Sequence, residues 1–153
     1  MYQRIFVPVD GRPTSRRGLD EAIALARFTK GRIHLMHVVD DMPIVAEGVE
    51  AFPAPGADII EMVNDGGKEI LANAQATVQQ SGVECDATMR RTTKGKIHEQ
   101  ILQEAMEWGA DLIVLGSHGR TGAERLFLGS DAEQVARNTD IPVLLVRQKD
   151  AEA

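Results

Sequence analysis

The chain has 153 residues, of which 43% are hydrophobic and 26% charged, values that fit one compact globular domain. A net charge of −6 and an aromatic content of 4% argue against nucleic-acid binding, which depends on clustered cations and stacking rings. The sequence has no apolar run as long as a membrane span, and its first residues lack the pattern of a signal peptide. We therefore expect a cytoplasmic protein that inserts into no membrane.

The N-terminal part of the chain predicts two strands with a helix between them. Residues 4–9 form a short, nearly continuous apolar run, which is typical of a strand buried on both faces of a parallel sheet. Apolar residues then recur at helical spacing over 16–28, and Thr14 or Ser15 is expected to cap this helix. A second apolar run at 32–39 predicts the second strand.

A long loop and a long helix are expected next. The segment 40–58 is rich in proline, and loops of this length are usually functional lids or disordered excursions. Helical spacing resumes over 59–80. Gly66 and Gly67 weaken the middle of this helix, so the sequence allows a kink or a break there.

The remaining segments continue the alternation of strand and helix. Residues 83–91 predict a more amphipathic strand, as expected near a sheet edge, and 97–109 predict a helix. Strands follow at 111–116 and 142–147, separated by a helix that starts near Ser130. This order predicts a single-domain α/β fold, Rossmann-like, with a five-stranded parallel sheet and helices on both faces. Ligands of such folds bind at the carboxyl ends of the strands, where the strand order reverses.

Glycines crowd the segment after the fourth predicted strand. The stretch GSHGRTG, 116–122, lets backbone N–H groups approach a ligand closely and form an anion-binding nest. After Gly129, Ser130 is expected as a helix N-cap and Glu133 as the partner that completes a capping box, and such a helix start suits a phosphate. Tight turns alone would explain the glycines equally well. The P-loop and GxGxxG patterns do not match, which disfavours a conventional NTPase or dehydrogenase.

At these residues the chain resembles a known family. The pattern G-2x-G-9x-G-[S/T] is met by Gly116, Gly119, Gly129 and Ser130. Together with the segments DLIVLGSHGRTG and IPVLLVR, it is similar to the universal stress protein family. The resemblance extends over almost the whole chain, because RIFVPVDG and LMHVVD look like the family's first two strands.

The resemblance implies a fold and an assembly. The fold is that of the adenine nucleotide alpha hydrolase-like proteins, here expected over 1–150, with the loop 40–58 inside it and 151–153 as a tail. The family also implies a homodimer in which the C-terminal strand, 142–147, pairs with its twin.

Family members with this glycine pattern bind ATP, and the resemblance implies the same ligand here, with or without Mg²⁺. Pro8, Val9 and Asp10 match positions that lie against the adenosine, with Asp10 placed to accept from a ribose hydroxyl. Val38 matches the residue whose backbone reads the adenine edge. The positions that match those around the ribose and the phosphates are Gly116, Ser117, His118, Gly119, Arg120, Thr121, Gly122, Gly129, Ser130 and Asp131.

Asp131 departs from the family pattern, which usually has a small apolar residue at this position. An acid in the first helical turn interacts favourably with the helix dipole. The same carboxylate repels phosphates unless Mg²⁺ lies between the two. The sequence therefore supports adenosine recognition more strongly than triphosphate binding.

Other polar residues indicate neither a catalytic residue nor a metal site. His34 and His37 lie three apart in a strand and point to opposite faces, so they do not easily share an ion. Cys85 is expected to be a half-buried small residue and not a reactive thiol. A solvated helix face is expected to carry Glu99, Glu104 and Glu107.

The function that the sequence favours is that of a cytoplasmic, ATP-binding stress-response protein that acts as a nucleotide-dependent regulatory dimer. Any hydrolysis should be slow, because no efficient catalytic base is visible. Two alternatives stay open: an interaction protein of the same fold that binds no nucleotide, and a slow hydrolase that uses Mg²⁺ held by Asp10 or Asp131. The sequence names no protein partner.

Overall fold

The computed structural model describes residues 1–41, 56–117 and 129–148, with the backbone alone for 56–60. Five strands form one parallel sheet in the order β3-β2-β1-β4-β5. The strands are β1 (Arg4–Pro8), β2 (Arg32–Asp40), β3 (Cys85–Thr92), β4 (Leu112–Ser117) and β5 (Val143–Arg147). The helices are α1 (Pro13–Thr29), α3 (Gly56–Gln80), α4 (Ile97–Trp108) and α5 (Ser130–Asn138).

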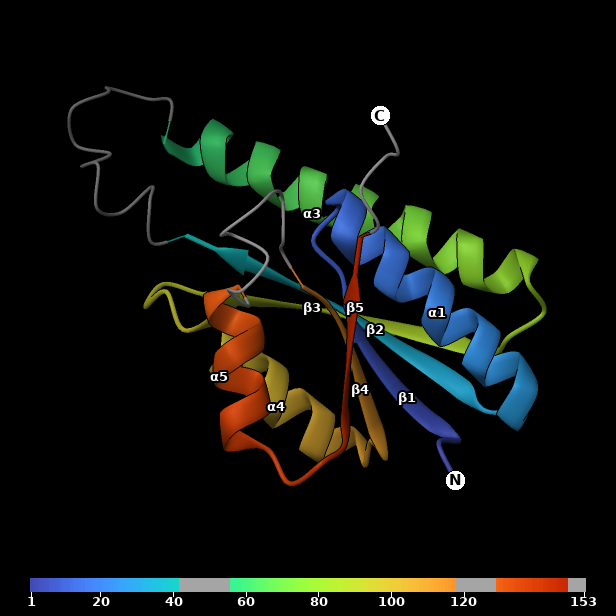
Figure 1. The fold of residues 1–153 in the computed structure, drawn as a ribbon. Helices are drawn as coiled ribbons and strands as arrows, with labels where there is room; N and C mark the ends of the chain where they lie inside the picture. The colour runs from blue at the N-terminus through green and yellow to red at the C-terminus, as the bar shows by residue number, and fades with distance from the viewer. Residues whose placement is uncertain (42–55, 118–128, 149–153) are drawn as a thin grey trace, which may run out of the picture.

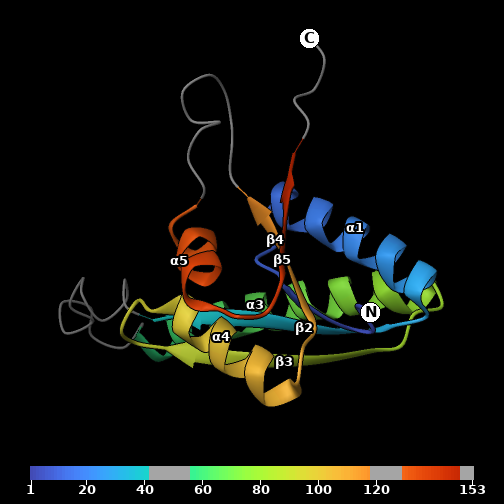
Figure 2. The same cartoon turned by 60° about the horizontal axis from the view of Figure 1, so that its bottom comes forward.

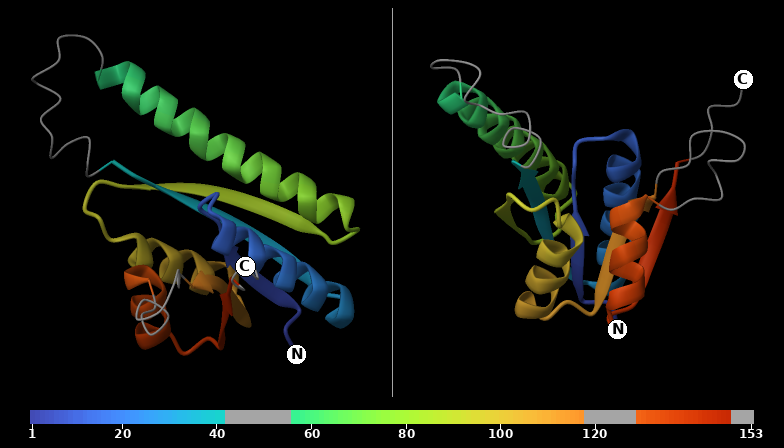
Figure 3. Two further views of the ribbon diagram at one scale, coloured as in Figure 1. Left: turned by 45° about the horizontal axis from the view of Figure 1, so that its top comes forward. Right: turned by 90° about the vertical axis from the view of Figure 1, so that its left-hand side faces the viewer.

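Helices cover both faces of the sheet. Figure 1 shows α1 and α3 on one side and α4 and α5 on the other, and the turned views in Figures 2 and 3 show the same layers. Successive side chains of a strand point to opposite faces, so Ile5 and Val7 pack under α1 and α3 while Phe6 packs under α4 and α5. The predicted fold class is confirmed.

The sheet has a reversal point beside its central strand. From β1 the chain moves outward through β2 to β3, and it then crosses to the other side of β1 to form β4 and β5. The amphipathic strand β3 lies at one edge, as its sequence predicted. The carboxyl ends of β1 and β4 therefore diverge at the point where folds of this class bind ligands.

Two local expectations differ from the structure. α1 begins at Pro13 after Arg12, so Thr14 and Ser15 lie inside its first turn and neither is the N-cap. Proline suits the first helical position, where an N–H would have no intrahelical acceptor. α3 runs without a break through Gly66 and Gly67.

Part of the predicted loop 40–58 belongs to regular structure. Asp40 ends β2, and α3 begins at Gly56. Residues 42–55 lie outside the described part of the chain, as does the predicted tail 151–153. In the ranges that are described, no helix is both long enough and apolar enough to cross a bilayer.

Candidate functional site

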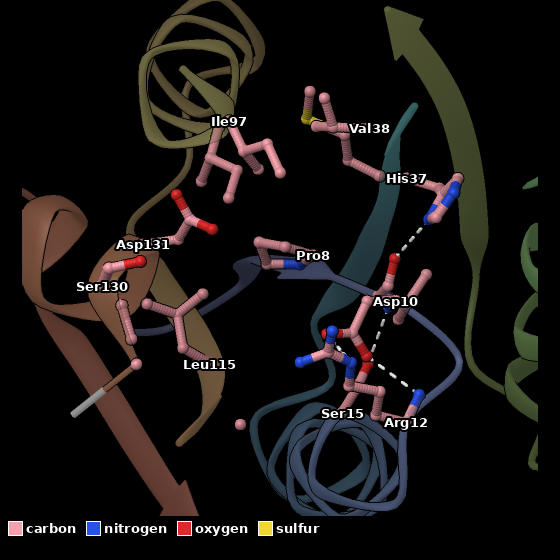
Figure 4. Close-up of a pocket in the computed structure, with 16 residues that line it drawn as sticks. Pro8, Asp10, Arg12, Ser15, His37, Val38, Ile97, Leu115, Ser130 and Asp131 are labelled. Atoms are coloured by element: carbon pink, nitrogen blue, oxygen red, sulfur yellow. Dashed lines mark hydrogen bonds and ion pairs between the residues drawn. The ribbon is translucent and has the colours of Figure 1, made fainter. Parts of the chain in front are cut away.

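A pocket of about 380 Å³ opens at the reversal point of the sheet. Figure 4 shows Ser130 and Asp131 on its α5 side and Asp10, Arg12 and Ser15 on its α1 side. The sequence-predicted residues that line it are Pro8, Val9, Asp10, Val38, Gly116, Gly129, Ser130 and Asp131. The lining residues that the sequence did not assign to a ligand site are Arg12, Ser15, Met36, His37, Ile97, Ile101, Leu115 and Ala132.

The other residues that the sequence predicted for the site are not among the described residues that line the pocket. Ser117 ends β4 and is buried, at 2% exposure, without lining the pocket. His118, Gly119, Arg120, Thr121 and Gly122 lie outside the described residues.

The turn after β1 fixes the carboxylate of Asp10. The backbone N–H of Arg12 donates to Asp10 Oδ1 at 2.9 Å, and the Arg12 Nε lies 4.0 Å from Asp10 Oδ2. The backbone N–H of Asp10 donates to the Ser15 hydroxyl at 3.1 Å. Gly11 has a φ of 79°, a left-handed conformation that glycine adopts without strain. The sequence of this turn therefore holds an acceptor group at the pocket wall before any ligand arrives.

Gly116 lets β4 pass directly against the first turn of α1. A Cβ at this position would lie 2.3 Å from the Thr14 carbonyl oxygen and 2.8 Å from the Ser15 backbone nitrogen. This contact is what brings Ser15 to the pocket and explains why sequence spacing alone did not find it. The glycine was predicted for its approach to a ligand, and the structure adds this packing reason.

His37 is held in place by the backbone of β1. Its Nδ1 lies 2.8 Å from the carbonyl oxygen of Val9, and because a carbonyl only accepts, Nδ1 carries the proton and donates. The backbone N–H of Val9 in turn donates to the carbonyl of Met36 at 2.8 Å. Val38 follows on the same strand, so these bonds position the wall that contains it.

The start of α5 differs from the predicted capping box. Gly129 occupies the N-cap position and Ser130 is the first helical residue, with no side-chain cap bond. Glu133 pairs instead with Arg137, at 2.7 Å. The first backbone bond of the helix runs from the Glu133 N–H to the Gly129 carbonyl. The N–H groups of 130–132 therefore have no acceptor within the helix, at the rim of the pocket.

Asp131 brings a negative charge to this helix start. Its Oδ1 lies 3.9 Å from His98 Nδ1, and its side chain is 45% exposed. The carboxylate points from α5 into the pocket (Figure 4). Among the described residues, no group of three or more His, Cys, Asp or Glu side chains is arranged to hold a metal ion.

A second polar cluster lies away from the pocket, between α4 and the strands β2 and β3. His34 bridges two carboxylates, with Nδ1 2.7 Å from Asp86 Oδ1 and Nε2 3.1 Å from Glu104 Oε1. Arg90 pairs with both Glu104, at 2.5 Å, and Glu107, at 2.8 Å. Hydrogen bonds from Gln103 and Arg90 lower the pKa of Glu107. Glu104 was predicted on a solvated face, and this was wrong, because it is only 8% exposed.

Cys85 lies beside this cluster at the beginning of β3. Burial, together with the nearby charge of Asp86, raises the pKa of its thiol to about 11. The thiol therefore stays protonated at neutral pH and is a poor nucleophile, as its sequence context suggested.

Comparison with known proteins gives a consistent picture. The family model described as the universal stress protein family matches residues 1–147. Universal stress protein MJ0531 of Methanocaldococcus jannaschii is 33% identical over 150 residues, covering 97% of this chain and 84% of the relative.

Solved structures show the same arrangement. The structure of MJ0577, another universal stress protein of Methanocaldococcus jannaschii, superposes with a TM-score of 0.79 at 27% identity and covers 99% of each chain. A universal stress protein from Archaeoglobus fulgidus in complex with dAMP matches with a TM-score of 0.64 at 25% identity, covering 95% of this chain and 98% of that one.

Proposed function

The chain belongs to the universal stress protein family, and from this premise we propose that its pocket binds an adenine nucleotide. The protein then acts in the cytoplasm as a regulatory module whose shape or choice of partner follows the bound nucleotide. The observation that supports this most is that β1, β2 and α5 converge on one pocket, which Asp10, Val38 and Ser130 all line.

In this proposal Asp10 recognises the ribose. An ionised carboxylate has two acceptor oxygens, which suit the neighbouring hydroxyls of a ribose. Arg12 and Gly11 set the turn that orients the carboxylate, so little ordering is required when the ligand binds. In this proposal Asp10 contacts the ligand, and the turn after β1 positions Asp10.

The base is proposed to lie between apolar walls. Side chains from β2, β4 and α4 face the pocket, and a flat heterocycle fits such a surface when a few polar groups fix its orientation. The backbone of Val38 is proposed to supply those polar groups. The apolar side chains that line this part are Met36, Ile97, Ile101 and Leu115.

Phosphate groups are proposed to lie at the start of α5. The Ser130 hydroxyl and the N–H groups of 130–132 supply donors there, and the positive end of the helix dipole favours an anion. The dAMP bound by the Archaeoglobus fulgidus relative supports an adenine ligand for this family member as well. ATP, with or without Mg²⁺, is the ligand that the glycine pattern implies.

Binding measurements test this function. Calorimetric titration of the purified protein with adenosine, AMP, ADP and ATP, each with and without Mg²⁺, should detect binding to at least one of them. Asp10→Ala should weaken that affinity by about tenfold or more, because hydrogen bonds to charged groups are each worth about 1.5 to 3 kcal/mol. Asp20→Ala is the matched control, since Asp20 is an exposed acid of α1 that does not line the pocket.

The outcomes separate the open alternatives. Binding without turnover supports the regulatory function. Turnover of ATP with Mg²⁺ that is lost in Asp10→Ala favours the slow hydrolase. If no adenine compound binds, and mass spectrometry of the denatured protein finds none bound, the pocket is not a nucleotide site and the interaction protein is favoured.

We also propose that the protein is a homodimer through β5. This strand forms one edge of the sheet and pairs with β4 alone among the described strands. An edge strand offers unpaired backbone groups to a second strand. Leu144, the second residue of β5, is 39% exposed, so an apolar side chain is accessible at that edge.

A further inference from the structure

A carboxylate occupies the part of the pocket to which the proposed function assigns the phosphates. Asp131 is the second residue of α5, lines the pocket and points into it (Figure 4). Its side chain is 45% exposed, so water screens its charge only in part. A phosphate bound at the first turn of α5 must therefore approach a like charge.

The helix start already has its own negative charges. Asp131 and Glu133 both lie in the first turn of α5, where carboxylates interact favourably with the positive end of the helix dipole. Asp131 reduces the positive potential that an incoming phosphate would otherwise meet, whereas the charge of Glu133 is paired with Arg137 at 2.7 Å. The N–H groups of 130–132 still offer hydrogen bonds, but these donors do not discriminate among one, two and three phosphates.

The cations on the described walls do not offset this charge. Arg12 is the one Lys or Arg side chain that lines the described part of the pocket, and it lies on the α1 side, with its Nε 4.0 Å from the Asp10 carboxylate. His98 Nδ1 lies 3.9 Å from Asp131 Oδ1, which is beyond hydrogen-bond distance, and His98 does not line the pocket. The described walls thus hold two carboxylates against one guanidinium.

The adenosine part of the pocket has a different character. Its walls are apolar side chains and backbone groups, and Asp10 is an acceptor that suits hydroxyls. The free energy of binding adenosine therefore depends little on Asp131, whereas that of each added phosphate depends on it directly.

We infer that Asp131 makes this pocket select adenine ligands of low phosphate charge, so that adenosine and AMP bind more tightly than ATP when no divalent cation is present. This inference rests on the proposed function, because it assigns a preference within the same site. It makes Asp131 a specificity-determining residue and AMP-like ligands the preferred class.

The test compares four ligands with three proteins. Adenosine, AMP, ADP and ATP are titrated calorimetrically, in buffer with EDTA, into the wild type, Asp131→Asn and Glu133→Gln. Asp131→Asn should raise ATP affinity by about tenfold, the change expected from removing one partly screened like charge, while adenosine affinity changes by less than about threefold. Glu133→Gln removes a charge from the same helical turn, but Glu133 pairs with Arg137 and does not line the pocket, so its ATP affinity should stay near that of the wild type.

Each outcome decides the inference. Wild-type affinity that falls from AMP to ATP, together with a selective gain of ATP affinity in Asp131→Asn, supports it. Adenosine or AMP binding combined with unchanged or lower ATP affinity in Asp131→Asn overturns it and leaves the proposed function standing. If none of the four ligands binds to any of the three proteins, both are overturned. Asp131→Ser, checked by circular dichroism for an intact fold, repeats the comparison if Asp131→Asn does not fold.

Discussion

At the scale of single residues, Glu104 shows how one buried carboxylate connects a helix to the sheet. It accepts from His34 of β2 and from Arg90 of β3, at 3.1 Å and 2.6 Å. We expect Glu104→Ala to lower the free energy of unfolding by about 1 to 3 kcal/mol, because the buried Nε2 of His34 loses its hydrogen-bond partner and Arg90 keeps Glu107 alone. Urea unfolding followed by circular dichroism measures this change.

Glu99 provides the matched control on the same helix. It pairs with Lys96 at 3.2 Å, and both side chains are more than half exposed. Exposed ion pairs contribute little, so Glu99→Ala should change the free energy of unfolding by less than about 1 kcal/mol. Equal losses for the two variants would mean that the buried cluster does not hold α4 in place.

At the scale of secondary-structure elements, two adjacent glycines decide how α3 packs on the sheet. A Cβ at Gly67 would lie 2.9 Å from His37 Cδ2 and 3.2 Å from Met89 Sδ, whereas a Cβ at Gly66 would meet nothing within 4 Å. Alanine at either position gains helix propensity of about 1 kcal/mol. Gly66→Ala should therefore stabilise the protein by about that amount, while crowding in Gly67→Ala, which costs about 1 to 3 kcal/mol, should cancel or reverse the gain.

The difference between these two variants isolates packing from helix propensity. Thermal unfolding followed by circular dichroism should show a higher midpoint for Gly66→Ala than for Gly67→Ala. The same midpoint for both would show that α3 does not need the close approach to β2 and β3. Because His37 lines the pocket, the crowded variant also tests whether α3 supports the wall that contains Val38.

The sequence predicted the elements better than their contacts. Continuous apolar runs predicted the strands and helical spacing predicted the helices, because both patterns are local. Glu104 was misplaced because its burial depends on His34 and Arg90, which come from two other strands. Ser15 was missed because the close contact of Gly116 with α1 is a tertiary feature. The capping box failed by one residue, because Gly129 and not Ser130 occupies the N-cap position.

At the scale of the whole molecule, the strand order gives the sheet two edges of different character. The β1–β4 reversal creates the pocket near the middle, while β3 and β5 form the edges. All eight residues of β3 pair with β2 over an amphipathic surface, and charged side chains such as Arg90 and Arg91 form ion pairs. β5 instead carries Val143, Leu144, Leu145 and Val146 to its edge. This asymmetry makes β5 the edge suited to a second chain.

The proposed dimer is therefore tested at Leu144. A dimer through β5 should give the wild type a solution mass near twice the 16.7 kDa of one chain. Leu144→Lys should shift the protein toward the mass of one chain, because a lysine on an edge strand opposes pairing with another strand. Met106→Lys is the matched control, since Met106 is an apolar residue of α4 that is 68% exposed and lies away from β5. Light scattering during gel filtration measures the masses. A wild type with the mass of one chain would mean that the protein is not a dimer. A dimer unaffected by Leu144→Lys would mean that the interface lies elsewhere.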